Sequence, residues 1–148
     1  MERKFKIKGQ AKISRIKKDG TILDTEVVDN IVVADGLERI AKLLNKIETT
    51  GFDAIGIGTG TTSATINDTE LQTEVAREVA TKTYIVPYKS RFAKTFTFAS
   101  GVSHNITEAG VFDNAVASGS IMLDRFTFSV KVVDADTDLL VQITLTIS

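Results

Sequence analysis

Apolar and polar residues alternate with a period of two along three segments in the second half of the chain: RFAKTFTF, DRFTFSVKV and LLVQITLTI. This pattern predicts antiparallel strands with one face toward a core and the other toward water. The inward-facing residues are expected to be Phe92, Phe96, Phe98, Phe126, Phe128, Val130, Val132, Leu139, Val141, Ile143, Leu145 and Ile147. Of these, we expect large burial for Phe96, Phe98, Phe126, Phe128, Val141 and Ile143. Short strands between turn clusters favour a mainly β fold, an antiparallel β-sandwich or a jelly-roll-like barrel.

The first part of the chain, about residues 1–29, predicts a basic β-hairpin. In KFKIK the apolar Phe5 and Ile7 share one face while lysines occupy the other. Lys18-Asp19-Gly20 is a turn signal, and the β-branched residues of 21–28 form the second arm. We interpret the lysines as the solvated face of this hairpin. A phosphate-binding patch is the alternative, which is less favoured because no aromatic residues interleave with the lysines.

One amphipathic helix is predicted at about residues 35–47, within ADGLERIAKLLNKI. Asp35 is expected to cap it, with Glu38 three residues later completing a capping box. The apolar stripe, expected to lie on a sheet, consists of Leu37, Ile40, Ala41, Leu44 and Ile47. The residues expected to face water are Glu38, Arg39, Lys42 and Lys46.

Length and charge set limits on the function. The 148 residues suit a single domain over residues 1–148, and the net charge of −1 gives no general attraction to nucleic acid or membranes. There is no cysteine, and no apolar stretch approaches the roughly 20 residues of a membrane span. The N-terminus lacks the apolar region of a secretory signal. We therefore expect neither a nucleic-acid partner nor a membrane partner.

The glycine-rich stretch IGIGTGTT, residues 55–62, invites comparison with nucleotide-binding loops. A P-loop requires a lysine after its last glycine, whereas Gly60 is followed by Thr61. The dinucleotide fingerprint requires a different glycine spacing and a following helix. We expect no specific binding of ATP, GTP or NAD here. Instead, AIGIG predicts a short buried strand whose glycines permit close backbone approach, followed by a Thr/Ser-rich surface loop.

Other chemistry-bearing residues lack the partners that a reaction or a metal would need. Asp134, Asp136 and Asp138 resemble the start of a calcium loop, but its required glycine and glutamate are replaced by leucines. A solvated hairpin turn is favoured there, with an adventitious Ca²⁺ site as the alternative. The single histidine, His104, beside Ser103, is interpreted as a turn residue.

Three further features of the sequence lack the context that a functional site would need. Glu74, Arg77 and Glu78 predict a local set of ion pairs and not a catalytic acid/base pair, because no supporting group follows. The glycosylation patterns that begin at Asn67 and Asn105 have no meaning without secretion. We therefore expect no catalytic residue, no metal site and no cofactor site, and predict that the protein is not an enzyme.

Several short motifs follow one another in order along residues 28–148. The helix ADGLERIAKLL is followed by IGIGTGTT and then by DTELQTEVAR; ITEAGVFDNA, residues 106–115, precedes the strands SIMLDRFTFSV and LLVQITLTI. This order resembles that in small virion structural proteins of tailed bacteriophages and prophages, described as tail, collar, fibre-associated or head-decoration proteins. In those proteins two motifs come first, a GTG-T stretch and the pattern DT-L-x-x-E-x-x-R. A third motif follows them, in which ITEAG is succeeded by an apolar residue and a phenylalanine. The N-terminal hairpin lies outside the resemblance.

The resemblance implies a non-enzymatic virion component, which binds further copies of itself and other virion proteins of the capsid, collar or tail. It would be assembled in the host cytoplasm. Because such particles present rotationally symmetric sites, we expect a homo-oligomer, with a trimer as the best single assignment. Residues 1–20 or 59–78 are expected at the subunit boundary, because the first 19 residues are basic and the remainder is acidic.

The alternative is a carbohydrate- or host-surface-binding β-sandwich module. Such a module usually presents exposed aromatic rings to sugars. The chain has no tryptophan, and Tyr84 and Tyr88 are its two tyrosines, so this function is less favoured.

Overall fold

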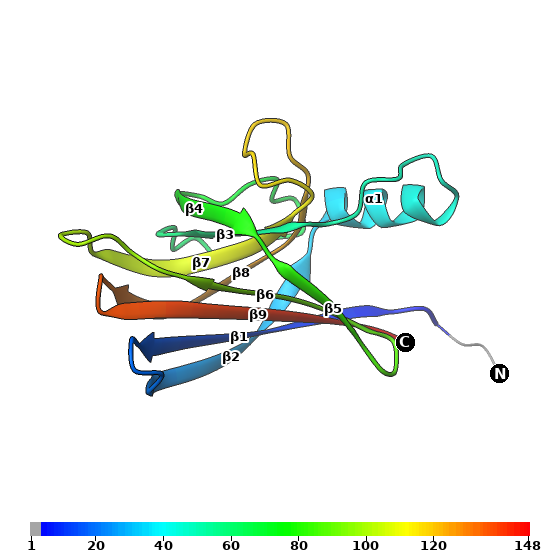
Figure 1. The fold of residues 1–148 in the computed structure, drawn as a ribbon. Coiled ribbons are helices and arrows are strands. Elements are labelled where there is room, and N and C mark those ends of the chain that lie inside the picture. The colour runs from blue at the N-terminus through cyan, green and yellow to red at the C-terminus, as the bar shows by residue number, and fades with distance from the viewer. Residues whose placement is uncertain (1–3) are drawn as a thin grey trace.

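The structure, a computed structural model, describes residues 4–148 and is mainly β (Figure 1). In this part of the chain there are nine strands and one helix. The strands are β1 (Ile7–Lys17), β2 (Ile22–Val32), β3 (Ala54–Gly58), β4 (Glu74–Val79), β5 (Thr81–Ile85), β6 (Lys89–Phe96), β7 (His104–Phe112), β8 (Met122–Val133) and β9 (Thr137–Ile147). The helix α1 (Ala34–Leu44) lies between β2 and β3.

The strands form one antiparallel sheet in the order β4-β3-β7-β8-β2-β1-β9-β6-β5, which curls into a nearly closed barrel. The two strands at the ends of this order, β4 and β5, are separated in sequence by Ala80 alone. The bend at Ala80 therefore brings the ends of the sheet together, and Ala80 N donates to Asp53 O (2.8 Å). The predicted antiparallel β-sandwich or jelly-roll-like barrel with one helix is confirmed.

The β2–β8 junction is the loosest in the sheet. Its pairs in the described chain are Ile31 with Arg125 and Val32 with Asp124. Farther along, the two strands are joined by side chains: Glu26 accepts hydrogen bonds from Ser129 N (3.3 Å) and Lys131 Nζ (2.8 Å). The barrel is therefore closed there by ionic and side-chain contacts instead of a ladder.

The core contains most of the residues that the alternation predicted. Five of the six residues expected to be largely buried are buried, namely Phe96, Phe126, Phe128, Val141 and Ile143. Phe98, the sixth, is half-buried and packs against this core. Leu139 and Leu145 are also buried on the inward face of β9.

The prediction that Val130 and Val132 face inward is wrong. Between the pairs Ile106–Lys131 and Glu108–Thr127, β7 contains one residue and β8 contains three. A bulge of this kind changes the phase of side-chain alternation. Consequently Lys131 and Val133 are buried, whereas Val130 and Val132 are 56% and 47% exposed.

The N-terminal hairpin predicted at about residues 1–29 is confirmed over β1 and β2, and residues 1–3 of that prediction lie outside the described residues. Lys17 N donates to Thr21 O (2.8 Å) across the turn, and Gly20 has the positive φ of 91° that favours glycine there. On the other side, β1 pairs with β9 along its whole length. Lys8 and Lys12 are exposed, as expected for the solvated face of the hairpin.

The predicted helix exists, but its expected cap is wrong. The helix starts one residue earlier, after Val33, and no side chain caps it. Backbone contacts replace the cap, because Val33 N donates to Leu123 O (3.0 Å) and Ala34 N donates to Ile66 O (2.8 Å). Asp35 and Glu38 therefore do not form the expected capping box.

The helix uses only part of its predicted apolar stripe: Ile40 packs against the core as expected, but other members do not. Gly36 packs on the backbone of Leu123, where any Cβ would lie 2.4 Å from the carbonyl oxygen. This close approach turns Leu37 and Leu44 of the apolar stripe to the surface. Ile47, beyond the end of the helix, is exposed as well. Arg39, expected in water, is instead largely buried and contacts Asp113 (2.8 Å).

Candidate functional site

Glu108, on β7, is the centre of a buried polar network outside the barrel core. The side chain is fully buried, and its Oε2 accepts hydrogen bonds from Gly60 N (2.7 Å) and Thr73 N (2.8 Å). Its Oε1 accepts one from Gln72 N (2.8 Å). These donors come from the two ends of one loop, residues 60–73. A single carboxylate therefore fastens both ends of this loop onto β7.

Arg125, on β8, fastens the middle of the same loop. Its Nε lies 3.1 Å from Glu108 Oε1, and its Nη1 lies 2.9 Å from Asp68 Oδ2. Its Nη2 donates to Thr62 O (2.8 Å). The Arg125 side chain is 2% exposed, so both its charge and that of Glu108 depend on these contacts for compensation.

The glycines of IGIGTGTT make room for this network. A Cβ on Gly60 would lie 2.4 Å from Glu108 Oε2, and one on Gly58 would lie 2.3 Å from Thr73 O. The expected buried strand is confirmed, since every residue of β3 is buried. The glycines serve close packing of the loop backbone on β7, in agreement with the sequence interpretation.

Arg77, on β4, forms the expected ion pair with Glu74 through Nη2 (2.6 Å). Its guanidinium also lies 3.5 Å from the centre of the Phe112 ring, and its Nη1 donates to Ser120 Oγ (2.6 Å). Glu78 is not part of this set, because its nearest cation is that of Lys94 at 3.9 Å. The arginine therefore joins the end of the loop to the segment after β7.

Asp124 is a second fully buried acid. Its Oδ1 accepts a hydrogen bond from Val111 N (2.9 Å), and its Oδ2 contacts the side-chain amide of Asn30. Burial raises the pKa of Asp124 to about 7, although both hydrogen bonds act in the opposite direction. The Asp124 carboxyl therefore favours its neutral form in the folded protein at mildly acidic pH.

This shift predicts that stability falls as pH rises. The unfolded carboxyl has a pKa of about 3.9, so the stabilising contribution of the neutral form is complete below that value and is lost toward pH 7. We expect the wild-type free energy of unfolding to decrease by about 1 kcal/mol per pH unit relative to Asp124→Asn between about pH 5 and 6.5. Urea unfolding of both proteins measures this difference. Parallel pH profiles would contradict it.

The aspartates of the calcium-loop-like segment and His104, the other candidate residues, do not form a common site in the structure. Asp134 and Asp136 lie in the turn between β8 and β9, as the sequence predicted, while Asp138 forms an ion pair with Lys18. No group of three metal-binding side chains occurs within residues 4–148. The interpretation of His104 as a turn residue is wrong. It is the first residue of β7 and pairs with Val133, and its ring centre lies 5.8 Å from that of Phe98.

The sequence interpretation missed the buried charges. Strict alternation along DRFTFSVKV places Arg125 and Lys131 on the polar face, opposite Phe126 and Val130, yet both are buried. A signal was present, because ITEAGVF and IMLDRFTF place charged residues inside apolar strands. The hydrogen-bond partners of Arg125 could not be inferred from the sequence, because they lie 17 to 63 residues away from it along the chain.

The described N-terminal segment and the C-terminus lie at one end of the barrel (Figure 1), and exposed apolar side chains line a hollow there. We call this the apolar end; its exposed members are Phe5, Tyr84, Val86, Tyr88 and Ile147. Phe5 is 67% exposed and Tyr88 is 62% exposed. Large exposed apolar groups at one place mark a contact surface.

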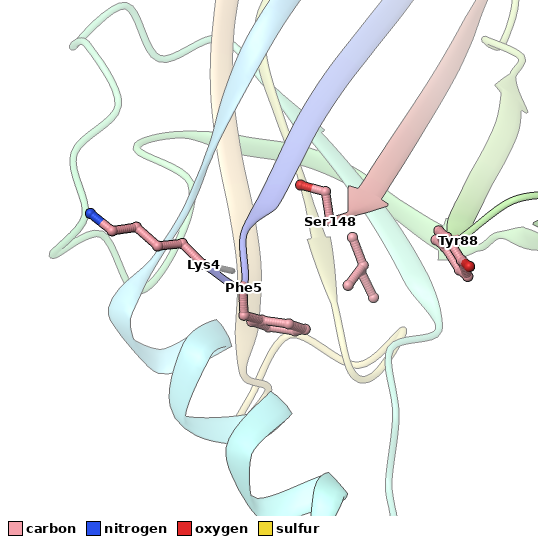
Figure 2. A pocket seen from close by; sticks show the side chains of 5 residues that line it. Lys4, Phe5, Tyr88 and Ser148 are labelled. Carbon is pink, nitrogen blue, oxygen red and sulfur yellow. The ribbon is translucent and has the colours of Figure 1, made fainter. Parts of the chain in front are cut away.

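A hollow of about 390 Å³ lies in this end, lined by Lys4, Phe5, Tyr88, Ile147 and Ser148. Figure 2 shows that Phe5, Ser148 and Tyr88 come from neighbouring strand ends. Backbone hydrogen bonds hold these ends together, from Ser148 N to Lys6 O (2.9 Å) and from Ile147 N to Tyr88 O (3.0 Å). The aromatic rings are thus carried on fixed backbone.

A basic groove adjoins the apolar end on the outer face of the sheet. This hollow of about 350 Å³ is lined by Lys8, Gly9, Gln10, Ile85, Lys89, Arg91, Thr144 and Thr146. In the sheet register, Lys8 and Lys89 flank Thr146 from the two neighbouring strands. Arg91 Nε donates to Thr144 Oγ1 (3.2 Å). Three cations thus converge on a surface whose lining includes no carboxylate side chain.

Within residues 4–148, no helix is long and apolar enough to cross a membrane. Comparison with known proteins gave no match to a family model, a curated protein or a solved structure.

Proposed function

We propose that the chain is a non-enzymatic structural component of a tailed-bacteriophage particle, in the tail, in the collar or on the capsid. It acts as a homo-oligomer, with a trimer as the preferred assignment, and contacts other virion proteins. The observation that carries the proposal is the clustering of exposed apolar side chains at one end of the barrel. A surface of this kind is suited to permanent protein contact.

The internal roles of the motif residues support the same proposal. Gly58, Gly60 and Glu108 belong to the stretches that resemble phage virion proteins, and they hold the loop 60–73 onto the sheet. Arg77 joins the end of this loop to Ser120. The contacts of these residues within the fold are sufficient to explain why the motifs contain them, and the explanation requires no substrate or cofactor.

The test is the composition of particles from the cells that encode the chain. Particles are purified by density gradient, and the chain is quantified by mass spectrometry against the major capsid protein. We expect it to co-sediment with particles at a fixed copy number. Recovery in the unassembled fraction, with none in washed particles, would overturn the proposal.

One observation favours the carbohydrate-binding alternative. Phe5, Tyr84 and Tyr88 are exposed aromatic residues at the apolar end, and such rings can stack on sugars. A glycan array with wild type and Tyr88→Ala distinguishes the alternatives. Saturable binding to one glycan class, lost in the variant, would support the binding module, whereas a virion contact predicts no glycan binding.

A further inference from the structure

Within residues 4–148, the cations of the basic groove have no acidic partner. Among residues 4–148, no carboxylate lies within 4.0 Å of the charged groups of Lys8, Lys89 or Arg91. Ten ion pairs exist elsewhere in this part of the chain, so most carboxylates are already engaged. The groove is therefore a concentration of positive charge that is available to an external anion.

Among residues 4–148, three of the carboxylates that form no ion pair lie at the opposite end of the barrel. We call it the turn end; it comprises the β1–β2 and β8–β9 turns, with Asp19, Asp134 and Asp136. The two turns are neighbours because Lys17 pairs with Thr137. A hydrogen bond from Thr21 lowers the pKa of Asp19, which keeps this carboxylate charged at neutral pH.

The turn end also has an apolar component that matches the apolar end. Its exposed apolar side chains are Ile22, Leu23, Val130 and Val132. The valines are exposed because the bulge in β8 reverses their direction. Each end of the barrel thus combines apolar groups with charge. At the turn end Asp19, Asp134 and Asp136 outnumber the nearby cation Lys17, so its net charge is opposite in sign to that of the basic groove.

The two ends cannot meet within one molecule. Strand β9 starts at Thr137, beside the acidic turn, and reaches the basic groove at Thr144 and Thr146. At about 3.4 Å per residue this separation is roughly 24–31 Å. Figure 1 shows the β1–β2 and β8–β9 turns at one end and the chain termini at the other.

We propose that the protein associates head to tail, the basic groove and apolar end of one copy receiving the acidic turn end of the next. The proposal rests on the self-assembly that is part of the proposed function. A contact between two different surfaces is heterologous, so it produces a ring when the rotation closes and a column when it does not. Both ends contribute apolar area as well as charge, which favours a second copy over a free anion or a flexible polyanion.

Two variants, each altered at one end, test the contact. The groove variant, Lys8→Glu with Lys89→Glu, reverses two cations for which no side-chain hydrogen bond is formed within residues 4–148. The turn variant, Asp134→Asn with Asp136→Asn, removes two negative charges without adding a cation that the groove variant could attract. It retains at position 134 an oxygen that can accept the hydrogen bond from the backbone N of residue 136. Lys12→Glu, on the same strand as Lys8 but outside the groove, is the matched control.

Sedimentation velocity is measured from about 10 μM to 1 mM at low and high salt, where the Debye length falls from about 10 Å at 0.1 M to about 3 Å at 1 M. We expect the wild-type protein to self-associate at low salt and its self-association to weaken at high salt. Each variant should weaken self-association at least about tenfold, as expected for the loss of about 1.4 kcal/mol. The Lys12→Glu control should stay within about twofold of wild type.

The decisive sample is an equimolar mixture of the two variants. The groove variant keeps an intact turn end and the turn variant keeps an intact groove, so the mixture should form a dimer that cannot grow further. A monomeric wild type at 1 mM and low salt, or a mixture that stays monomeric, would overturn the proposal. Heparin binding by a monomeric wild type, lost in the groove variant, would instead assign the groove to another polyanion. The composition of purified particles is measured in a separate experiment. A negative sedimentation result would therefore overturn the head-to-tail contact without deciding whether the protein is a virion component.

Discussion

Replacement of Arg125 by methionine is expected to lower the free energy of unfolding by about 3–5 kcal/mol, since it leaves the charge of Glu108 buried without its cation. Glu108 is fully buried, and Arg125 also fastens Thr62 and Asp68. Because the loop 60–73 loses its central attachment, we also expect faster proteolysis within it. Urea unfolding and limited proteolysis measure the two effects.

Two controls identify the cause of this loss. Lys82→Met removes a cation from the exposed pair with Asp53, where both side chains are more than 40% accessible, and should cost about 0–1 kcal/mol. Arg125→Met with Glu108→Gln removes both buried charges and should recover part of the loss. An Arg125→Met protein as stable as Lys82→Met would show that the buried pair does not hold the loop.

Replacement of Phe126 by alanine is expected to cost about 3–5 kcal/mol, through lost apolar burial and the cavity left behind. The ring is 1% exposed, and its centre lies 5.9 Å from that of Phe128, which is also in the core. Phe128→Ala should have an effect of similar size. Phe5→Ala, at an exposed ring of the apolar end, should change stability by less than about 0.5 kcal/mol. A small effect at position 126 would contradict the packing of this core.

Sequence periodicity predicts the inward faces of β6 and β9 because each pairs regularly with its neighbours. Periodicity fails at Val130 and Val132 because of the bulge in β8. A bulge arises when two paired strands have unequal numbers of residues between the same pairs, so the sequence of one strand alone does not show it. The helix shows a similar limit. Its apolar stripe gives the correct element, but the contact face is set by Gly36, whose missing side chain fits against Leu123.

The candidate site was predictable in part. The missing P-loop lysine and the glycine spacing favoured a packing role for IGIGTGTT, and Gly58 and Gly60 have that role. The apolar end was not predictable, because its residues come from strand ends and from the β5–β6 turn, which are far apart in the sequence. The basic groove likewise requires three strands to be neighbours, which follows from β9 entering between β1 and β6.

The pairing of β1 with β9 determines when the fold can be completed during protein synthesis. The eleven residue pairs between Ile7–Lys17 and Thr137–Ile147 join segments made at widely separated times. A ribosome adds about 5–20 residues per second, so the early hairpin waits several seconds for its second neighbour. During that interval the outer edge of β1 and the inner face with Ala11 and Ile13 are uncovered. The nascent chain is therefore most open to chaperones, and to pairing with other nascent chains, before residue 137 emerges.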